Sequence, residues 1–156
     1  LEISEIAIEM AEKRGVKVKK WDLNECPYPF NNSIFDVITV IDVLEHVINP
    51  SGLLREANRI VKSGGRVIIL VPNFARMTNR LRMLFMGDPL DMLHWSGYGD
   101  GMEHLHWFTK PKLKDFIEQA GFRGVNFHPI GLPLGFVFGI IGRHNLARSL
   151  IASAEK

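Results

Sequence analysis

The sequence has a single cysteine, Cys26, among its 156 residues. No disulfide can form within the chain, and a metal cluster held by several cysteines is excluded. Sparse cysteine is typical of proteins from a reducing compartment, so we expect a cytoplasmic location. Long apolar runs are absent as well. The nearest approach, residues 130–142, is interrupted by Pro133 and falls short of the roughly 18 residues that a transmembrane helix needs.

A strong charge of one sign is also lacking. The 19 lysines and arginines nearly balance the 17 aspartates and glutamates, and they are scattered along the chain. A nucleic-acid partner is therefore not expected. With 46% hydrophobic and 23% charged residues, the composition is that of an ordinary globular protein. The length suits one domain, so we expect residues 1–156 to form a single domain.

The most informative stretch is residues 35–47, where β-branched apolar residues are followed directly by polar ones. Residues 37–41 read Val-Ile-Thr-Val-Ile, which is typical of a strand buried on both faces of a parallel sheet. Asp42, Glu45 and His46 follow at its carboxyl end, the edge at which open α/β sheets bind ligands. The stretch therefore predicts the floor of a ligand site.

Apolar periodicity and turn residues predict the remaining elements. They are a helix begun by Ser4 and ended by Gly15, an edge strand at 16–21, a helix over 53–61 ended by Gly64 and Gly65, a buried strand at 66–71, a short helix over 77–85, a helix begun by Thr109 and ended by Gly121, a strand at 124–128 and a helix at 146–156. Strands that alternate with helices predict an α/β fold with a mostly parallel sheet. Residues 74–108 interrupt the pattern and predict an insertion on the substrate side.

This order of elements, together with the sequence at 35–46 and 56–65, resembles the class I S-adenosylmethionine-dependent methyltransferases that act on small molecules. The segment 104–109, His-Leu-His-Trp-Phe-Thr, extends the resemblance. It implies a Rossmann-like sheet with flanking helices and S-adenosylmethionine as cofactor. It also implies an enzyme that transfers the cofactor's methyl group to oxygen, nitrogen or carbon of a small organic acceptor.

The resemblance assigns cofactor-binding roles at the ends of two strands. Glu2, with Ile3 beside it, corresponds to the acid that accepts hydrogen bonds from the ribose hydroxyls. Asp22, with Leu23 beside it, corresponds to the residue that accepts from the adenine amino group. Each acid also has a local interpretation, because Glu2 precedes a helix and Asp22 begins a turn. Both interpretations stay open for each residue.

The resemblance places Ile41, Asp42 and His46 at the methionine part of the cofactor. In some methyltransferases an acid-x-x-Glu-His arrangement binds a divalent metal, and Asp42, Glu45 and His46 have that spacing. The alternative is that Glu45 and His46 hydrogen-bond locally and orient the turn. We favour this alternative for a motif match of this kind and predict no metal.

The predicted insertion is rich in side chains suited to contacting a substrate, namely His94, Trp95, Tyr98, His104, His106 and Trp107. A histidine titrates near neutrality and can take the proton of an acceptor hydroxyl. We choose His106 as the candidate base; the alternative is a histidine packed among aromatic residues. The apolar stretch 130–142 suggests either a lipophilic acceptor or a buried core segment.

One part of the family pattern is missing from this sequence: the first strand and the glycine-rich turn that approaches the cofactor. We therefore expect either a piece of a longer protein or a degenerate, non-catalytic domain that acts as a binding or dimerisation module. The missing strand would leave a gap in the sheet, which a homo-oligomer could close. A third interpretation, a dinucleotide-dependent oxidoreductase, shares the acid at Glu2 but explains residues 44–46 and 72–73 less well.

Overall fold

The computed structural model describes residues 1–87, 104–128 and 149–156. The predictions made for His94, Trp95, Tyr98 and residues 130–142 lie outside this described part. In chain order the elements are α1 (Glu5–Glu12), β1 (Phe35–Ile41), α2 (Pro50–Ile60), β2 (Val61–Pro72), α3 (Met77–Met86), α4 (Lys110–Gln119), β3 (Arg123–His128) and β4 (Ser149–Glu155). None of the described helices has the length and apolar character needed to cross a bilayer.

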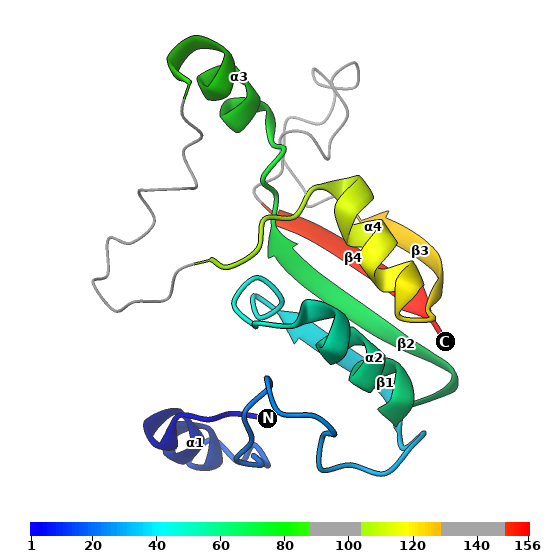
Figure 1. The fold of residues 1–156 in the computed structure, drawn as a ribbon. Helices are drawn as coiled ribbons and strands as arrows, with labels where there is room; N and C mark the ends of the chain where they lie inside the picture. Colours follow the sequence, from blue (N-terminus) through cyan, green and yellow to red (C-terminus); the bar gives the residue numbers. More distant parts are fainter. Residues whose placement is uncertain (88–103, 129–148) are drawn as a thin grey trace.

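The described strands form one sheet in the order β1-β2-β4-β3 (Figure 1). β1 and β2 pair in parallel, whereas β4 is antiparallel to both β2 and β3. β1, β2 and β3 therefore run in one direction and β4 alone is reversed. The unit β1–α2–β2 is a parallel crossover. The predicted α/β, Rossmann-like class with flanking helices is confirmed, and the described sheet is mixed, with three of its four strands running in one direction.

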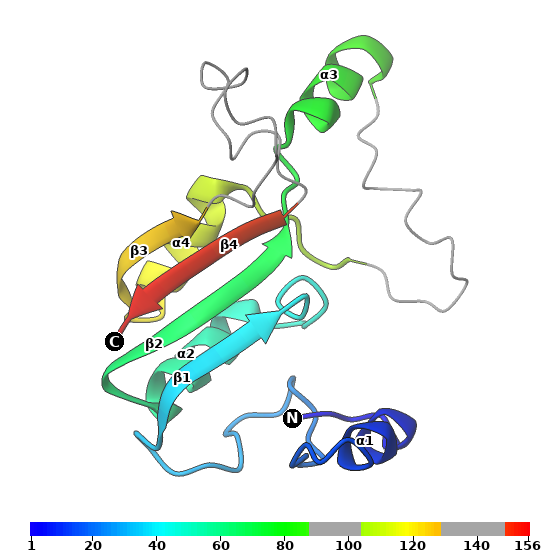
Figure 2. The same cartoon turned by 180° about the vertical axis from the view of Figure 1, so that it is seen from behind.

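The hydrophobic core lies between the sheet and the helices α2 and α4, which cover the same face of it (Figure 1). Seen from behind, the opposite face has no described helix against its centre (Figure 2). The alternation of β2 follows this arrangement, because Val67, Ile69 and Val71 are fully buried while Ile68 and Leu70 are partly exposed. The buried members belong to the same hydrophobic core cluster as Leu54 of α2.

Helix α2 begins one turn earlier than its apolar periodicity predicts. The Asn49 side chain accepts a hydrogen bond from the Gly52 amide (2.9 Å), and Pro50 occupies the first turn. The helix ends at Ile60, so the prediction that Gly64 and Gly65 end it is wrong. These glycines lie within β2 instead, where the pairing with β1 is irregular.

The glycine pair has a conformational reason to be there. Gly64 adopts a φ of +75°, which favours glycine. A β-carbon on Gly65 would lie 2.8 Å from the Asp36 carbonyl oxygen. The pair therefore lets β2 pass close to β1 while the register shifts.

The chain's last segment is a strand, so the predicted helix at 146–156 is wrong. In β4 buried and partly exposed residues alternate, with Leu150, Ala152 and Ala154 buried. Their period of two and the two neighbouring strands outweigh the helix propensity of alanine and glutamate. The strand at 124–128 is confirmed, as are the helices that begin after Thr109 and at Met77.

The N-terminal segment is less regular than predicted. Of the predicted edge strand at 16–21, the structure forms only an isolated parallel bridge between Glu2 and Lys20. The apolar residues of 16–21 alternate with lysines, whose side chains favour solvent. Little apolar area is therefore available to stabilise a longer strand pairing in this segment. Helix α1 lies apart from the sheet (Figure 2).

Strand β1 therefore stands at an edge of the described sheet. Its burial also differs from the prediction of a strand covered on both faces, since Val40 is buried but Val37 and Ile41 are each about half exposed. In the described residues no strand pairs with the second edge of β1. Within the described part of the chain, Val37 and Ile41 are therefore left partly open to solvent.

Candidate functional site

The turn after β1 is built so that polar side chains leave the strand in different directions. Asp42 has a φ of 49°, in the left-handed region, and its amide still donates to the Leu70 carbonyl oxygen (3.0 Å). The His46 amide donates to the Val43 carbonyl oxygen (2.9 Å) and closes the turn. Asp42 stays exposed at the surface, while Glu45 points into the protein.

Glu45 is the most unusual residue of this turn. It is only 1% exposed, and both carboxylate oxygens are buried without a hydrogen-bond partner among the described residues. Burial, with the nearby Asp42 charge as a smaller contribution, raises the pKa of Glu45 to about 7. A buried carboxylate without donors is costly in an ordinary core. The local interpretation predicted that Glu45 forms hydrogen bonds that orient the turn. Its backbone carbonyl oxygen accepts such bonds, but its carboxylate forms none among the described residues.

A second segment, 104–108, is held against this turn by its backbone. The Leu105 and His106 amides both donate to the Glu45 carbonyl oxygen, at 2.8 and 3.1 Å. Phe108 is buried and forms a parallel bridge with Asn73, the residue that follows β2. The carboxyl ends of β1 and β2 and this segment therefore meet at one edge of the sheet.

Three histidines gather at this edge. The rings of His46 and His104 lie with their centroids 4.8 Å apart and tilted by 58°. Nε2 of His46 is 3.9 Å from Oε1 of Glu45, too far for a hydrogen bond. Nδ1 of His46 and Nε2 of His106 are buried and have no hydrogen-bond partner in the described part of the chain. His104, His106 and Trp107 line a small hollow together with Pro72 and Phe74.

The two predicted cofactor acids lie together in the N-terminal segment. The bridge between Glu2 and Lys20 places Glu2 beside the start of the segment that leads to Asp22. Oε1 of Glu2 accepts from the amides of Ile3 and Ser4 (2.8 and 2.9 Å), and Oδ1 of Asp22 accepts from Asn24. These are the bonds that the local interpretations predicted.

Each acid nevertheless retains one free acceptor. Oε2 of Glu2 and Oδ2 of Asp22 form no hydrogen bond within the described residues. A ribose hydroxyl or an adenine amino group needs such an acceptor. The carboxylates therefore fit the donors of a nucleoside cofactor.

The apolar candidates divide into two groups. Ile3 and Ile41 are more than half exposed, whereas Leu23 packs against the core. The loop that contains Leu23 also reaches the β1 turn, because Asn24 accepts a hydrogen bond from the Ile48 amide (2.8 Å). Among the described residues, no hydrogen bond joins Glu2 or Asp22 directly to the residues after β1.

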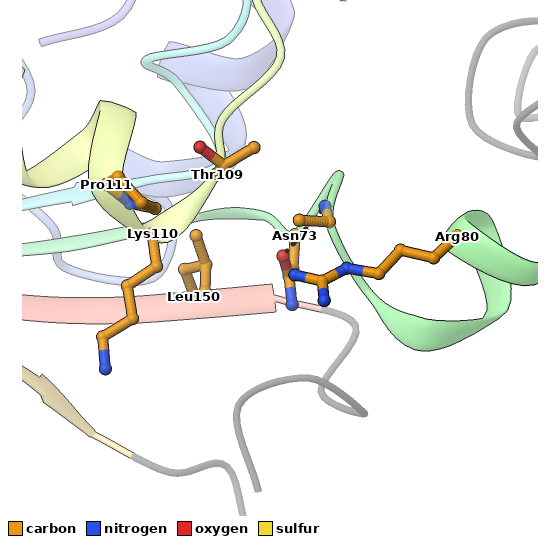
Figure 3. Close-up of a pocket in the computed structure, with 7 residues that line it drawn as sticks. Asn73, Arg80, Thr109, Lys110, Pro111 and Leu150 are labelled. Atoms are coloured by element: carbon orange, nitrogen blue, oxygen red, sulfur yellow. Dashed lines mark hydrogen bonds between the residues drawn. The ribbon is translucent and has the colours of Figure 1, made fainter. Parts of the chain in front are cut away.

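A larger cavity of about 290 Å³ lies farther along the same edge, between the end of β2 and the start of α4. Figure 3 shows Arg80 extending from α3 toward Asn73, with Thr109, Lys110 and Pro111 on the other side. None of the predicted site residues lines this cavity, although Thr109, the predicted start of a helix, does. Its lining includes two cationic side chains, Arg80 and Lys110, which no motif had singled out.

Sequence reasoning missed the convergence of Glu45 with His104. Each was singled out separately, Glu45 by its position after a buried strand and His104 as a candidate for substrate contact. The position of Glu45 did not show that its side chain points inward. The proximity of His104 depends on the bridge between Asn73 and Phe108, which joins segments far apart in the sequence.

Several of the curated proteins similar to this chain are quinone methyltransferases. A demethylmenaquinone methyltransferase of Tropheryma whipplei is 26% identical over 95% of this chain and 64% of that protein. A ubiquinone/menaquinone biosynthesis C-methyltransferase of Ralstonia nicotianae is 30% identical over 74% of this chain and 50% of that protein. The chain thus spans about half to two thirds of the length of these curated relatives.

Solved structures of S-adenosylmethionine-dependent methyltransferases have a similar fold. An S-adenosylmethionine-dependent methyltransferase of Thermotoga maritima, described as a possible histamine N-methyltransferase, superposes with a TM-score of 0.69. The superposition covers 99% of this chain and 71% of that one at 21% identity, so it concerns the fold alone. Residues 1–126 match the family described as methyltransferase domain. The chain therefore belongs to the methyltransferase domain family.

Proposed function

We propose that this protein binds S-adenosylmethionine and transfers a methyl group to a small organic acceptor. The observation that carries the proposal is the family match over residues 1–126, combined with the retained acceptor oxygens of Glu2 and Asp22. The side chains that would hold the cofactor are Glu2 and Ile3 at the ribose, Asp22 and Leu23 at the adenine, and Ile41, Asp42 and His46 at the methionine part.

The relatives suggest the acceptor class. Two of them are named for menaquinone or ubiquinone biosynthesis, which points to a lipophilic aromatic ring as the acceptor here. The hollow lined by Phe74 and Trp107 supplies apolar and aromatic surface beside the histidines. We place the acceptor there.

Bound S-adenosylmethionine supplies an electrophilic methyl group on a sulfonium sulfur. The chain's own residues would position the acceptor in line with that methyl group and remove one proton from it. Nε2 of His106, buried and without a partner among the described residues, is the proton acceptor in this proposal. Its backbone is fixed by the hydrogen bond to the Glu45 carbonyl oxygen, so the ring has a defined place beside the hollow.

Two finer points belong to the same proposal. The exposed free thiol of Cys26 is compatible with a reducing compartment, and we infer a cytoplasmic location. The unpaired edge of β1 supports a homo-oligomer. It also favours the second candidate function, a non-catalytic domain that serves in dimerisation.

Calorimetric titration of S-adenosylhomocysteine into the protein expressed from its complete gene tests the proposal. We expect saturable binding at one site per chain, weakened at least tenfold by Glu2→Gln and by Asp22→Asn. Glu12→Gln, which removes an exposed charge from the end of α1, is the matched control and should bind as the unmodified protein does. Absence of binding by the unmodified protein would reject methyl transfer and leave the non-catalytic domain.

A further inference from the structure

Glu45, His46 and His104 bring together three groups that commonly bind metal ions. Glu45 and His46 belong to the turn after β1, whereas His104 belongs to the segment that precedes α4. One carboxylate oxygen and one nitrogen of each imidazole all lie within 4.8 Å of one another. In the described part of the chain, no other group of three histidine, cysteine, aspartate or glutamate side chains lies this close together.

The carboxylate of Glu45 points into this cluster without a donor to satisfy it. At 1% exposure it is removed from water, and neither oxygen has a hydrogen-bond partner among the described residues. Nδ1 of His46 is in the same situation. Buried polar atoms normally have partners, so unsatisfied buried polar atoms on two neighbouring residues suit a site that binds a cation.

The backbone around the cluster is fixed, so the side chains alone need to adjust. The Glu45 carbonyl oxygen is held by two amides of the segment 104–108, and the His46 amide closes the turn at Val43. Ligand atoms on a tetrahedral ion lie about 3.4 Å apart, given metal–ligand distances of about 2.1 Å. The three ligand atoms now lie within 4.8 Å of one another. Small side-chain rotations are enough to bring them to the spacing of about 3.4 Å that the ion requires.

We propose that Glu45, His46 and His104 form a binding site for one divalent transition-metal ion of the zinc or cobalt type. Two imidazoles and one carboxylate suit such ions better than Mg²⁺ or Ca²⁺, which take mainly oxygen ligands. Three protein ligands leave a fourth position open. His104 also lines the hollow with Phe74 and Trp107, so the site lies beside the proposed place of the acceptor.

Binding of the ion is independent of methyl transfer. A further role, polarisation of an acceptor oxygen at the open position, rests on the proposed function. The metal test therefore uses no methyl donor and measures coordination directly.

The experiment titrates Co²⁺ into chelator-treated protein and records its visible absorption, with Zn²⁺ competition for affinity. We expect one ion per chain, a visible band typical of four- or five-coordinate Co²⁺, and its displacement by one equivalent of Zn²⁺. Glu45→Gln and His104→Ala should each weaken binding at least tenfold. His128→Ala is the matched control and should leave binding unchanged. It removes a histidine of β3, at the other edge of the sheet, whose ring is hydrogen-bonded to Ser153 of β4.

Three outcomes would overturn the proposal. The first is the absence of stoichiometric binding to the unmodified protein. The second is binding that Glu45→Gln and His104→Ala leave unchanged, with His104→Gln as a more conservative variant should His104→Ala not fold. The third is loss of binding in Asp42→Asn with retention in His104→Ala, which would place the ion on Asp42, Glu45 and His46 instead. If the protein binds Co²⁺ but does not bind S-adenosylhomocysteine, the proposed function is rejected and the metal site is retained.

Discussion

Glu56 is the residue on which the loop before β1 depends most. Its carboxylate accepts hydrogen bonds from Nε and Nη2 of Arg59 (2.9 and 2.7 Å) and from the Tyr28 amide (2.6 Å). Arg59 in turn donates to the carbonyl oxygens of Tyr28 and Phe30. Both residues belong to the stretch 56–65 that carries the family resemblance, but the sequence did not show that they hold residues 28–30, which lie nearly thirty positions earlier.

This pair predicts an acid-dependent loss of stability. The hydrogen bond from Arg59, followed in effect by the Tyr28 amide and the Arg59 charge, lowers the pKa of Glu56 below 4.5 despite burial. A lowered pKa in the folded protein contributes stability above the unfolded value of 4.5, and the contribution is lost as pH falls through the folded pKa. Glu56→Gln should therefore reduce the free energy of unfolding by about 1–3 kcal/mol at pH 7.

Urea unfolding of both proteins at several pH values measures the effect. The difference between them should shrink as pH falls below 4.5. Glu12→Gln at pH 7 controls for the loss of one negative charge and should change the free energy of unfolding by less than about 0.5 kcal/mol. A difference for Glu56→Gln that stays constant down to the acid transition would contradict the assignment.

At the scale of elements, local signals predicted the helices better than the strands. Ser4 and Thr109 mark helix starts in the sequence and accept capping hydrogen bonds in the structure. β4 was mistaken for a helix because alanine and glutamate favour helices locally, whereas its pairing with β2 and β3 is set by distant residues. Tertiary contacts decide such segments, and one sequence does not contain them in readable form.

The start of α2 is a test of the local signals. Asn49→Ala removes the acceptor that caps the Gly52 amide and should lower the free energy of unfolding by about 1 kcal/mol. Asn49→Asp keeps an acceptor and adds a negative charge near the helix N-terminus, so it should be neutral or stabilising. Thermal or urea unfolding of the two variants distinguishes capping from a general effect of the substitution. Equal destabilisation by both would argue against the cap.

At the scale of the whole molecule, the candidate polar side chains after β1 lie at the edge of the sheet where the sequence predicted a ligand site. The rule that ligands bind at strand carboxyl ends located Asp42, Glu45 and His46 correctly at that edge. It could not predict which side chain turns inward, since that depends on the left-handed backbone at Asp42 and on the segment packed over the turn. The joint position of Glu2 and Asp22 also required the bridge at Lys20.

The open edge of β1 predicts self-association. Val37 and Ile41 are each about half exposed on a strand that has no partner on one edge among residues 1–87, 104–128 and 149–156, a combination that promotes pairing between chains. Sedimentation velocity of residues 1–156 should show an average mass that rises with concentration. Val37→Lys should reduce the association, whereas Lys17→Ala, in the exposed N-terminal segment, should not. A monomer at all concentrations would contradict the prediction.

The bridge between Asn73 and Phe108 has a consequence for how the sequence of this protein can change in evolution. The segment between those two residues begins and ends at one place on the sheet, where the Phe74 amide donates a hydrogen bond to the Phe108 carbonyl oxygen (3.0 Å). Loop-closure entropy grows slowly, by about 0.6 kcal/mol for each doubling of length. The segment between Asn73 and Phe108 can therefore lengthen, shorten or be exchanged for that of a relative while the sheet is conserved, so this part of the chain can diverge without loss of the fold.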